Sequence, residues 1–140
     1  MNKVFALIDC NNFFVSCERV FRPDLEKKPV LVLSNNDGCV IARSQEVKDL
    51  GVAMGIPLFM IKDVIKDKNV NIFSCNFELY GDISNRVMTI LEEFCSNIEI
   101  YSIDEAFLEL SALNIKDYES FGNEIVERIK KEVGVPVSVV

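Results

Sequence analysis

Hydrophobic and polar positions divide the opening of the chain into a strand, a turn and a helix. The apolar run 1–8 predicts a strand that is buried on both faces and ends at Asp9. The next residues are polar, so Asn11 and Asn12 are candidate caps for a helix whose apolar positions continue to Phe21. The spacing therefore predicts an acid at a strand end, directly before a helix N-terminus.

The stretch from about residue 22 to residue 75 is predicted to form a small mixed unit. We expect two strands joined by a turn, two short helices and a third strand, at residues 30–33, 39–42, 45–50, about 58–66 and 70–73. Ser44 is the predicted N-cap of the first of these helices. This unit reads as an insertion into something larger.

Longer elements return in the second half. A helical stripe runs for about five turns from Phe77, apolar runs at 98–103 and 106–110 predict a hairpin, and a helix at about 117–132 and a strand at 135–140 follow. Without the insertion the order is strand, helix, helix, strand, strand, helix, strand. With the two helices beside the insertion counted as one layer, we expect an α+β fold with a ferredoxin-like, split βαββαβ sheet.

An adjacent acid pair, Asp104 and Glu105, lies between the two runs of the predicted hairpin. Neighbouring side chains of a straight strand point to opposite faces, so these two acids can share a ligand only where the backbone bends. Two carboxylates at one place repel each other unless a cation or a proton lies between them. Because the chain has no His, a hard divalent cation bound by oxygen is the natural ligand. The alternative is an ordinary solvated turn.

A third acid, Asp9, favours the cation site over the solvated turn. It closes an apolar strand, which is where sheets of this kind present their ligands. Three carboxylates from two strand ends can hold two ions roughly 3.5–4 Å apart, the arrangement used for in-line phosphoryl or nucleotidyl transfer.

Length and composition are typical of a globular cytoplasmic protein. The 140 residues are 49% hydrophobic and 26% charged, enough for one compact core and at most one further subdomain. No apolar run approaches the ~20 residues that a membrane span needs, and the N-terminus lacks the order of a signal peptide. The five cysteines are widely spaced, odd in number and without a Cys-x-x-Cys pair, which favours free thiols over disulfides or zinc.

The net charge of −7 argues against nucleic-acid binding by this piece alone. Residues 1–70 carry 10 basic and 9 acidic groups, net +1, whereas residues 71–140 carry 5 and 13, net −8. This asymmetry favours a metal-centred core whose nucleic-acid contacts lie elsewhere. The alternative is that acidic helix faces keep the domain soluble.

Several linked motifs resemble those of the Y-family, or translesion, DNA polymerases, most closely their UmuC-like bacterial branch. The resemblance covers essentially the whole chain and rests on motifs in the same order along it, at residues 6–18, 21–25, 28–30, 33–44, 50–52, 76–80 and 98–107. The last of these is Ile-Glu-Ile-Tyr-Ser-Ile-Asp-Glu-Ala-Phe, which contains the acid pair.

The resemblance implies a metal site and a reaction. Asp9, Asp104 and Glu105 match the family's three metal-binding carboxylates, and the backbone carbonyl of Cys10 is a further implied ligand. Two Mg²⁺ ions would activate the primer 3′-hydroxyl and stabilise the triphosphate of the incoming dNTP.

The resemblance also implies nucleotide contacts. Phe14 matches the steric-gate position, where an aromatic ring occupies the space that a ribose 2′-hydroxyl would need, although by residue type alone Phe13 and Phe14 read as core. Gln45 and Lys48 fall where the family places a Tyr and an Arg near the triphosphate. Lys48 keeps the positive charge, whereas Gln45 departs from the commoner aromatic residue.

The predicted nucleotide-binding set is completed by Asn11, Asn12 and Phe13 at the predicted helix N-terminus, whose N–H groups suit a phosphate, and by Arg43. From the residues alone, ordinary surface polarity is the alternative for Arg43, Gln45 and Lys48.

In family terms, residues 1–12 and about 76–140 are palm, and residues 13–75 are fingers. Because the last apolar strand has no cap or polar tail after it, we expect these residues to be the front part of a longer protein. The resemblance implies that thumb and little-finger domains elsewhere in that protein grip duplex DNA. The 140-residue piece is expected to fold but to polymerise poorly or not at all. The implied partners are primer–template DNA, a UmuD-like subunit, a recombinase filament and the sliding clamp, in the damage-tolerance (SOS) response.

The sequence leaves two other interpretations open. A diguanylate-cyclase-like palm also uses a hairpin with adjacent acids, but it expects a glycine-rich lead where this chain has Tyr101-Ser102-Ile103. A receiver-like signalling module would use an acidic pocket for Mg²⁺, but its later strand-end Lys is missing from residues 135–140.

Overall fold

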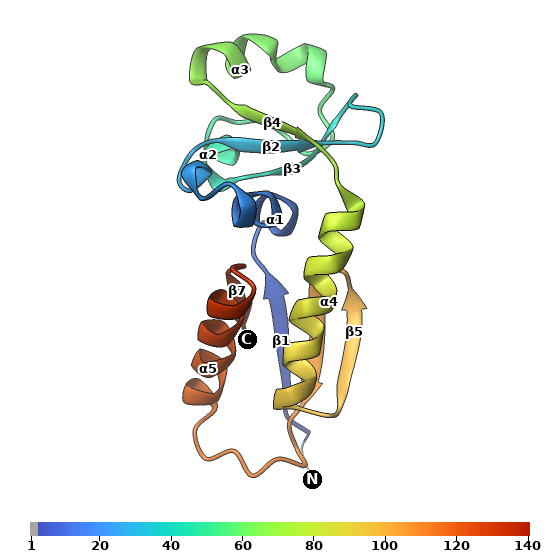
Figure 1. Ribbon diagram of the computed structural model, residues 1–140, viewed down its shortest axis with the longest axis vertical. Coiled ribbons are helices and arrows are strands. Elements are labelled where there is room, and N and C mark those ends of the chain that lie inside the picture. The colour runs from blue at the N-terminus through green and yellow to red at the C-terminus, as the bar shows by residue number, and fades with distance from the viewer. Residues whose placement is uncertain (1–2) are drawn as a thin grey trace. The chain divides into compact units, whose positions relative to one another are not determined.

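Residues 3–140 are described by a computed structural model, so the first two residues of the predicted opening strand lie outside the described part. The chain divides into two compact units, one made of residues 3–13 and Glu78–Val140 and the other of Phe14–Phe77. Each unit contains its own sheet (Figure 1).

The first unit contains the acid pair and a four-stranded sheet. Its elements are β1 (Phe5–Cys10), α4 (Phe77–Phe94), β5 (Ile98–Ser102), β6 (Glu105–Glu109), α5 (Tyr118–Glu132) and β7 (Val137–Val139). The strand order is β5-β6-β1-β7, and each neighbouring pair is antiparallel. This is the order of a ferredoxin-like sheet, so the predicted fold class is confirmed.

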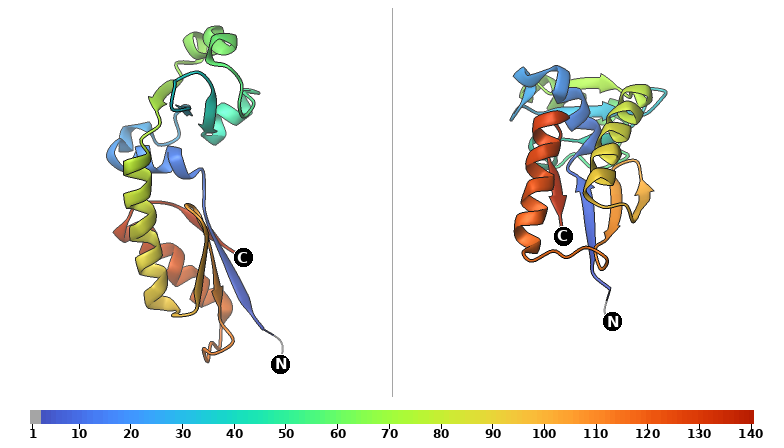
Figure 2. Two further views of the ribbon diagram at one scale, coloured as in Figure 1. Left: turned by 90° about the vertical axis from the view of Figure 1, so that its right-hand side faces the viewer. Right: turned by 60° about the horizontal axis from the view of Figure 1, so that its bottom comes forward.

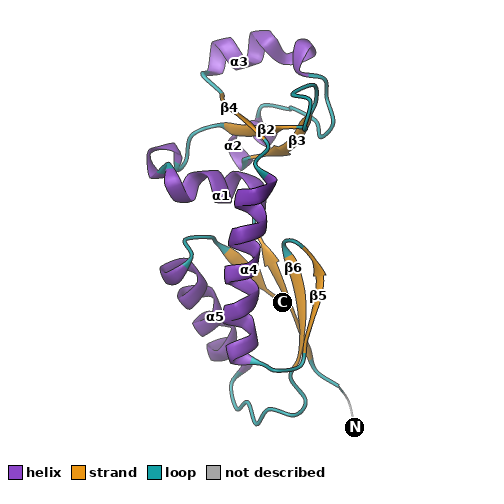
Figure 3. Cartoon of the chain, turned by 45° about the vertical axis from the view of Figure 1, so that its right-hand side comes forward, coloured by secondary structure: helices purple, strands orange, loops and turns teal. Residues whose placement is uncertain are grey.

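Helices α4 and α5 cover one face of this sheet, as the side view in Figure 2 and the cartoon in Figure 3 show. Buried apolar side chains come from both layers. Those of the strands are Ala6 and Ile8 on β1 and Ala106 and Leu108 on β6, and those of the helices are Val87 and Leu91 on α4 and Ile125 and Ile129 on α5. The helical spacing within α4 and α5 places their apolar residues on the side that contacts the sheet.

The prediction that the first strand is buried on both faces is wrong. Ala6, Ile8 and Cys10 are buried, whereas Leu7 and Asp9 are half-buried and Phe5 is 55% exposed. Because side chains alternate along a strand and both helices lie on one side, only every second residue of β1 reaches the core. Asp9 therefore lies on the more open face.

The second unit, Phe14–Phe77, contains the mixed insertion predicted at about residues 22–75. It also contains α1 (Phe13–Phe21), so the prediction that this helix forms one layer with α4 is wrong. The elements of this unit are α1, a 3₁₀ turn η1 (Pro23–Leu25), β2 (Val30–Leu33), β3 (Val40–Arg43), α2 (Gln45–Asp49), η2 (Leu58–Ile61), α3 (Lys62–Lys68) and β4 (Asn71–Ser74). Strand β2 is central and fully buried, antiparallel to β3 and parallel to β4. Its side chains share one core with residues of α2, η2 and the loops, among them Val47, Val52 and Ile61.

Two local predictions in this unit have different outcomes. Ser44 caps α2 as expected, since its hydroxyl accepts a hydrogen bond from the Val47 N–H. The prediction of a single helix at about 58–66 is wrong, because the 3₁₀ turn η2 comes first and the α-helix α3 begins only at Lys62. Ile61 leaves the helical backbone region (φ −124°, ψ 16°) and is buried, so its packing interrupts the helix.

The cysteines agree with the prediction of free thiols. Cys10, Cys17 and Cys95 are buried, and Cys39 and Cys75 are half-buried, all without a disulfide. Within residues 3–140, none of the helices is long and apolar enough to cross a membrane.

Candidate metal centre

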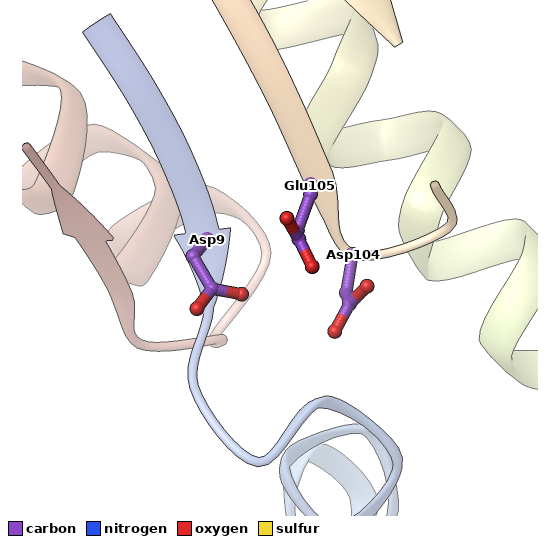
Figure 4. A group of neighbouring side chains, drawn as sticks. All are labelled: Asp9, Asp104 and Glu105. Carbon is purple, nitrogen blue, oxygen red and sulfur yellow. The ribbon is translucent and has the colours of Figure 1, made fainter. Parts of the chain in front are cut away.

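The three predicted acids come from two neighbouring strands and the turn before one of them. Asp9 of β1 lies directly opposite Glu105, the first residue of β6, in the antiparallel pairing. Asp104 lies in the turn between β5 and β6, so the acid pair is at a bend, as predicted. One carboxylate oxygen from each residue lies within 4.8 Å of the other two (Figure 4). The predicted proximity of Asp9 to the acid pair is confirmed.

Hydrogen bonds hold this turn in three places. The Cys10 N–H donates to the Asp104 carbonyl at 2.9 Å, which joins the turn to β1. The Ser84 hydroxyl on α4 donates to the Ile103 carbonyl at 2.6 Å. The Ser102 hydroxyl donates to Oδ1 of Asp104 at 2.9 Å, which fixes one carboxylate oxygen.

The acids create a negative potential at this place. Partial burial, followed by the charge of Asp104, raises the pKa of Asp9 above its ordinary value. Burial, followed by the charges of Asp104 and Asp9, raises the pKa of the Cys10 thiol to about 12. The Cys10 side chain is buried and alternates with Asp9 along β1, so its sulfur points to the core face and not toward the acids. The available donors are carboxylate oxygens, which fit a hard divalent cation and not a thiophilic one.

Three of the predicted nucleotide-binding residues, Asn11, Asn12 and Phe13, follow the end of β1 and differ in their contacts, backbone conformation and burial. The Asn11 N–H donates to the Pro136 carbonyl, and its side-chain oxygen accepts from the Ser138 hydroxyl. Asn12 adopts a positive φ of 45°, which tightens the passage from β1 to α1. Phe13 is buried, in agreement with the core reading of its residue type.

The other predicted nucleotide-binding residues belong to the second unit. Phe14 is half-buried, and its ring meets the ring of Phe77 edge to face at 6.0 Å. The Gln45 side chain donates to Asp49 one helical turn later. Arg43 donates to the Val52 carbonyl at 2.6 Å, while its buried Nε has no hydrogen-bond partner among the described residues. Arg43 thus contacts the loop after α2.

Sequence reasoning missed the two serines that hold the acid turn. Ser84 occupies a buried position of α4, between Tyr80 and Val87 on the apolar stripe. A hydroxyl at a position where the helical period expects an apolar residue is the signal that was available. Ser102 lies two residues before Asp104, a spacing that suits a side-chain hydrogen bond across a turn.

Comparisons with known proteins agree with this fold. A sequence model described as the impB/mucB/samB family matches residues 8–140, so the chain belongs to this family. Among curated relatives, it is 54% identical over 137 residues to Protein UmuC of Salmonella typhimurium, covering 97% of this chain and 32% of that protein. It is 32% identical over 141 residues to DNA polymerase IV of Picrophilus torridus, covering 97% of this chain and 40% of that protein.

Solved structures that share this fold include a DNA polymerase. Dbh DNA polymerase in an insertion ternary complex matches with a TM-score of 0.86 and 26% identity, over 96% of this chain and 41% of that one. DinB from Sulfolobus solfataricus matches with a TM-score of 0.83 and 25% identity, over 96% and 40%. The resemblance to Y-family polymerases of the UmuC-like branch is thus confirmed. The chain spans about a third of the length of the curated relatives UmuC and ImpB of Salmonella typhimurium.

The two other interpretations lose their support. A receiver-like module needs a parallel, doubly wound sheet, whereas each neighbouring pair in the sheet that carries Asp9 is antiparallel. A diguanylate-cyclase-like palm shares the sheet type, but the family match over residues 8–140 is to impB/mucB/samB proteins.

Proposed function

We propose that the chain is the catalytic front part of a translesion DNA polymerase, which transfers a deoxynucleotide from dNTP to a primer 3′-hydroxyl on a DNA template. The observation that carries this proposal is the cluster of Asp9, Asp104 and Glu105 in a chain of the impB/mucB/samB family. In this reading the first unit belongs to the palm and the second to the fingers.

In the proposed mechanism the three carboxylates and the Cys10 carbonyl would hold two Mg²⁺ ions. When bound, the ions supply Lewis-acid activation of the primer hydroxyl and charge stabilisation of the triphosphate. The β1–β6 pairing holds Asp9 and Glu105 face to face, and the turn adds Asp104 beside them. The protein's contribution is to fix these oxygens before substrate arrives, which lowers the reorganisation that the reaction requires.

Other residues would select and hold the nucleotide. Phe14 acts as the steric gate against ribonucleotides, and Lys48 supplies positive charge to the triphosphate. Because the Phe13 side chain is buried, Phe13 would contribute through its backbone, together with Asn11 and Asn12.

Arg43 and Gln45 are the less direct members of the proposed nucleotide set. Since the Arg43 guanidinium contacts the Val52 carbonyl, Arg43 would act by positioning the loop after α2. Gln45 donates to Asp49 and would have to exchange this bond for a phosphate contact.

The wider setting of the proposal follows the family resemblance. A UmuD-like subunit, a recombinase filament and the sliding clamp are the proposed partners, in the cytoplasm during the response to DNA damage. Because the chain spans about a third of its curated relatives, we propose that these residues form the metal site but do not extend primers efficiently alone.

A chimera tests the function directly. This chain would replace the matching 137 residues of Salmonella typhimurium UmuC, and nucleotide incorporation on a primed template would be measured with that protein's partners present. We expect incorporation, and we expect Asp104→Asn to lower it at least about a hundredfold. Glu99→Gln, which neutralises an exposed acid on β5 of the same hairpin, is the matched control and should keep activity. A chimera that folds but incorporates no nucleotide would refute the proposal.

A further inference from the structure

Ser84 is a polar residue at a place where the fold otherwise buries apolar side chains. It lies on the inner side of α4 with 8% of its surface exposed, among the buried residues Tyr80, Val87 and Met88. A buried hydroxyl is costly unless it is hydrogen-bonded, so its partner determines what it does. That partner is not its own helix: Ser84 donates to the carbonyl of Ile103, 19 residues later, at 2.6 Å.

The Ile103 carbonyl belongs to the turn that carries Asp104. The two successive carbonyls of this turn are tied to different elements, the Ile103 carbonyl to α4 through Ser84 and the Asp104 carbonyl to β1 through the Cys10 N–H. A two-residue connection with both carbonyls fixed has little freedom to rotate. The direction of the Asp104 side chain toward Asp9 and Glu105 is thereby set from both sides.

We propose that Ser84 is a positioning residue for the metal centre, which holds the Ile103–Asp104 turn in the conformation that brings the Asp104 carboxylate within reach of the ion held by Asp9 and Glu105. This inference rests on the proposed metal site and extends it to a helix that supplies no ligand. Groups that orient metal ligands from outside typically change metal affinity 10- to 100-fold when removed. Because Ser84 acts through the backbone of the turn, we expect about tenfold.

The experiment uses a pair of variants with nearly the same shape. Ser84→Thr keeps the hydroxyl and Ser84→Val replaces it by a methyl group, so both add similar bulk to the buried site and differ in the hydrogen bond. Mn²⁺ affinity would be measured by electron paramagnetic resonance on the purified chain, without nucleotide or DNA. The expected result is about tenfold weaker Mn²⁺ binding by Ser84→Val than by Ser84→Thr.

A second measurement reads the turn itself in the metal-free protein. The Cys10 amide, which donates to the Asp104 carbonyl, should exchange its hydrogen faster in Ser84→Val than in Ser84→Thr. The Val140 amide, which donates to Leu7 in the same sheet, serves as the reference and should exchange equally in both. Thr89→Val removes a hydroxyl from an exposed position of α4, where it bonds within the helix, and should leave Mn²⁺ affinity unchanged.

The outcomes separate this inference from the metal site on which it rests. If the unmodified chain binds Mn²⁺ and the two Ser84 variants bind it equally, with equal Cys10 exchange, Ser84 does not position the turn and the metal site stands. If the unmodified chain does not bind Mn²⁺ at all, both the metal site and the role of Ser84 are overturned.

Discussion

Asp9 and Glu105 face each other across the β1–β6 ladder, as directly paired residues of two antiparallel strands. Opposed residues have their Cβ atoms about 4.5–5.5 Å apart and point to the same face of the sheet. Like charges at such a pair destabilise the sheet unless something neutralises them. Because Asp104 adds a third carboxylate beside this pair, a bound cation would relieve the repulsion between them.

The first prediction concerns the cost of these charges without metal. Since burial and Asp104 raise the pKa of Asp9 in the fold, the native state binds its proton more tightly than the unfolded chain does. Stability is therefore lost as pH rises from the ordinary Asp value through the raised one, and the loss persists at neutral pH. In EDTA at pH 7, Asp9→Asn should equal or slightly exceed the parent chain, by less than about 1 kcal/mol because solvent screens the site.

Thermal unfolding with and without Mg²⁺ or Mn²⁺ checks this prediction. The ion should raise the melting temperature of the parent chain and have little effect on Asp9→Asn, since only the parent keeps the full ligand set. Equal stabilisation of both proteins by the ion would contradict the assignment of Asp9 as a ligand.

The second prediction distinguishes the backbone of Cys10 from its side chain. If the carbonyl is the ligand, Cys10→Ala should keep the ion-dependent rise in melting temperature, although loss of the buried sulfur lowers stability in general. The raised thiol pKa, about 12, also predicts slow alkylation of Cys10 at pH 8 compared with the half-buried Cys39 and Cys75. Mass spectrometry after iodoacetamide treatment measures this order, and rapid labelling of Cys10 in the folded chain would contradict it.

The third prediction tests the steric gate with a matched pair of variants. Phe14→Ala and Phe77→Ala each remove one ring of the same edge-to-face pair, so each loses about 0.5–1.5 kcal/mol of aromatic contact. In the UmuC chimera, only Phe14→Ala should raise ribonucleotide incorporation relative to deoxynucleotide, by at least about tenfold, or 1.4 kcal/mol. An equal increase in ribonucleotide incorporation with Phe77→Ala would indicate a general loss of packing and would contradict the steric-gate role of Phe14.

The fourth prediction concerns the fold of the second unit. The buried Ser44 hydroxyl accepts hydrogen bonds from the N–H groups of Val47 and Val30. Ser44→Ala removes a helix cap and leaves the buried Val30 N–H unpaired, which together should cost about 2–3 kcal/mol. Urea unfolding measures the loss. Because the acid cluster lies in the other unit, Mn²⁺ affinity of the folded variant should stay unchanged.

The spacing of apolar and polar residues predicted the parts of the fold that have a local sequence signature. The long stripe of α4, the hairpin around Asp104 and the Ser44 cap each have a local signature, and each was found in the expected place. The chain order of these elements was enough to predict the ferredoxin-like sheet.

Features that depend on neighbours distant in sequence were not predictable in this way. The apolar run of β1 gives no sign that both helices lie on one side of the sheet, so the half-open face with Phe5 and Asp9 was missed. Ile61 interrupts the helix expected at residues 58–66 because the core of its unit takes its side chain. The bond from Ser84 to Ile103 joins two elements whose contact no local pattern encodes.

The most direct test of the account is anomalous diffraction from crystals of the chain grown with Mn²⁺. We expect an anomalous peak between the carboxylates of Asp9, Asp104 and Glu105, at about 2.0–2.3 Å from their oxygens. Mn²⁺ bound elsewhere, with no peak among these three side chains, would contradict it.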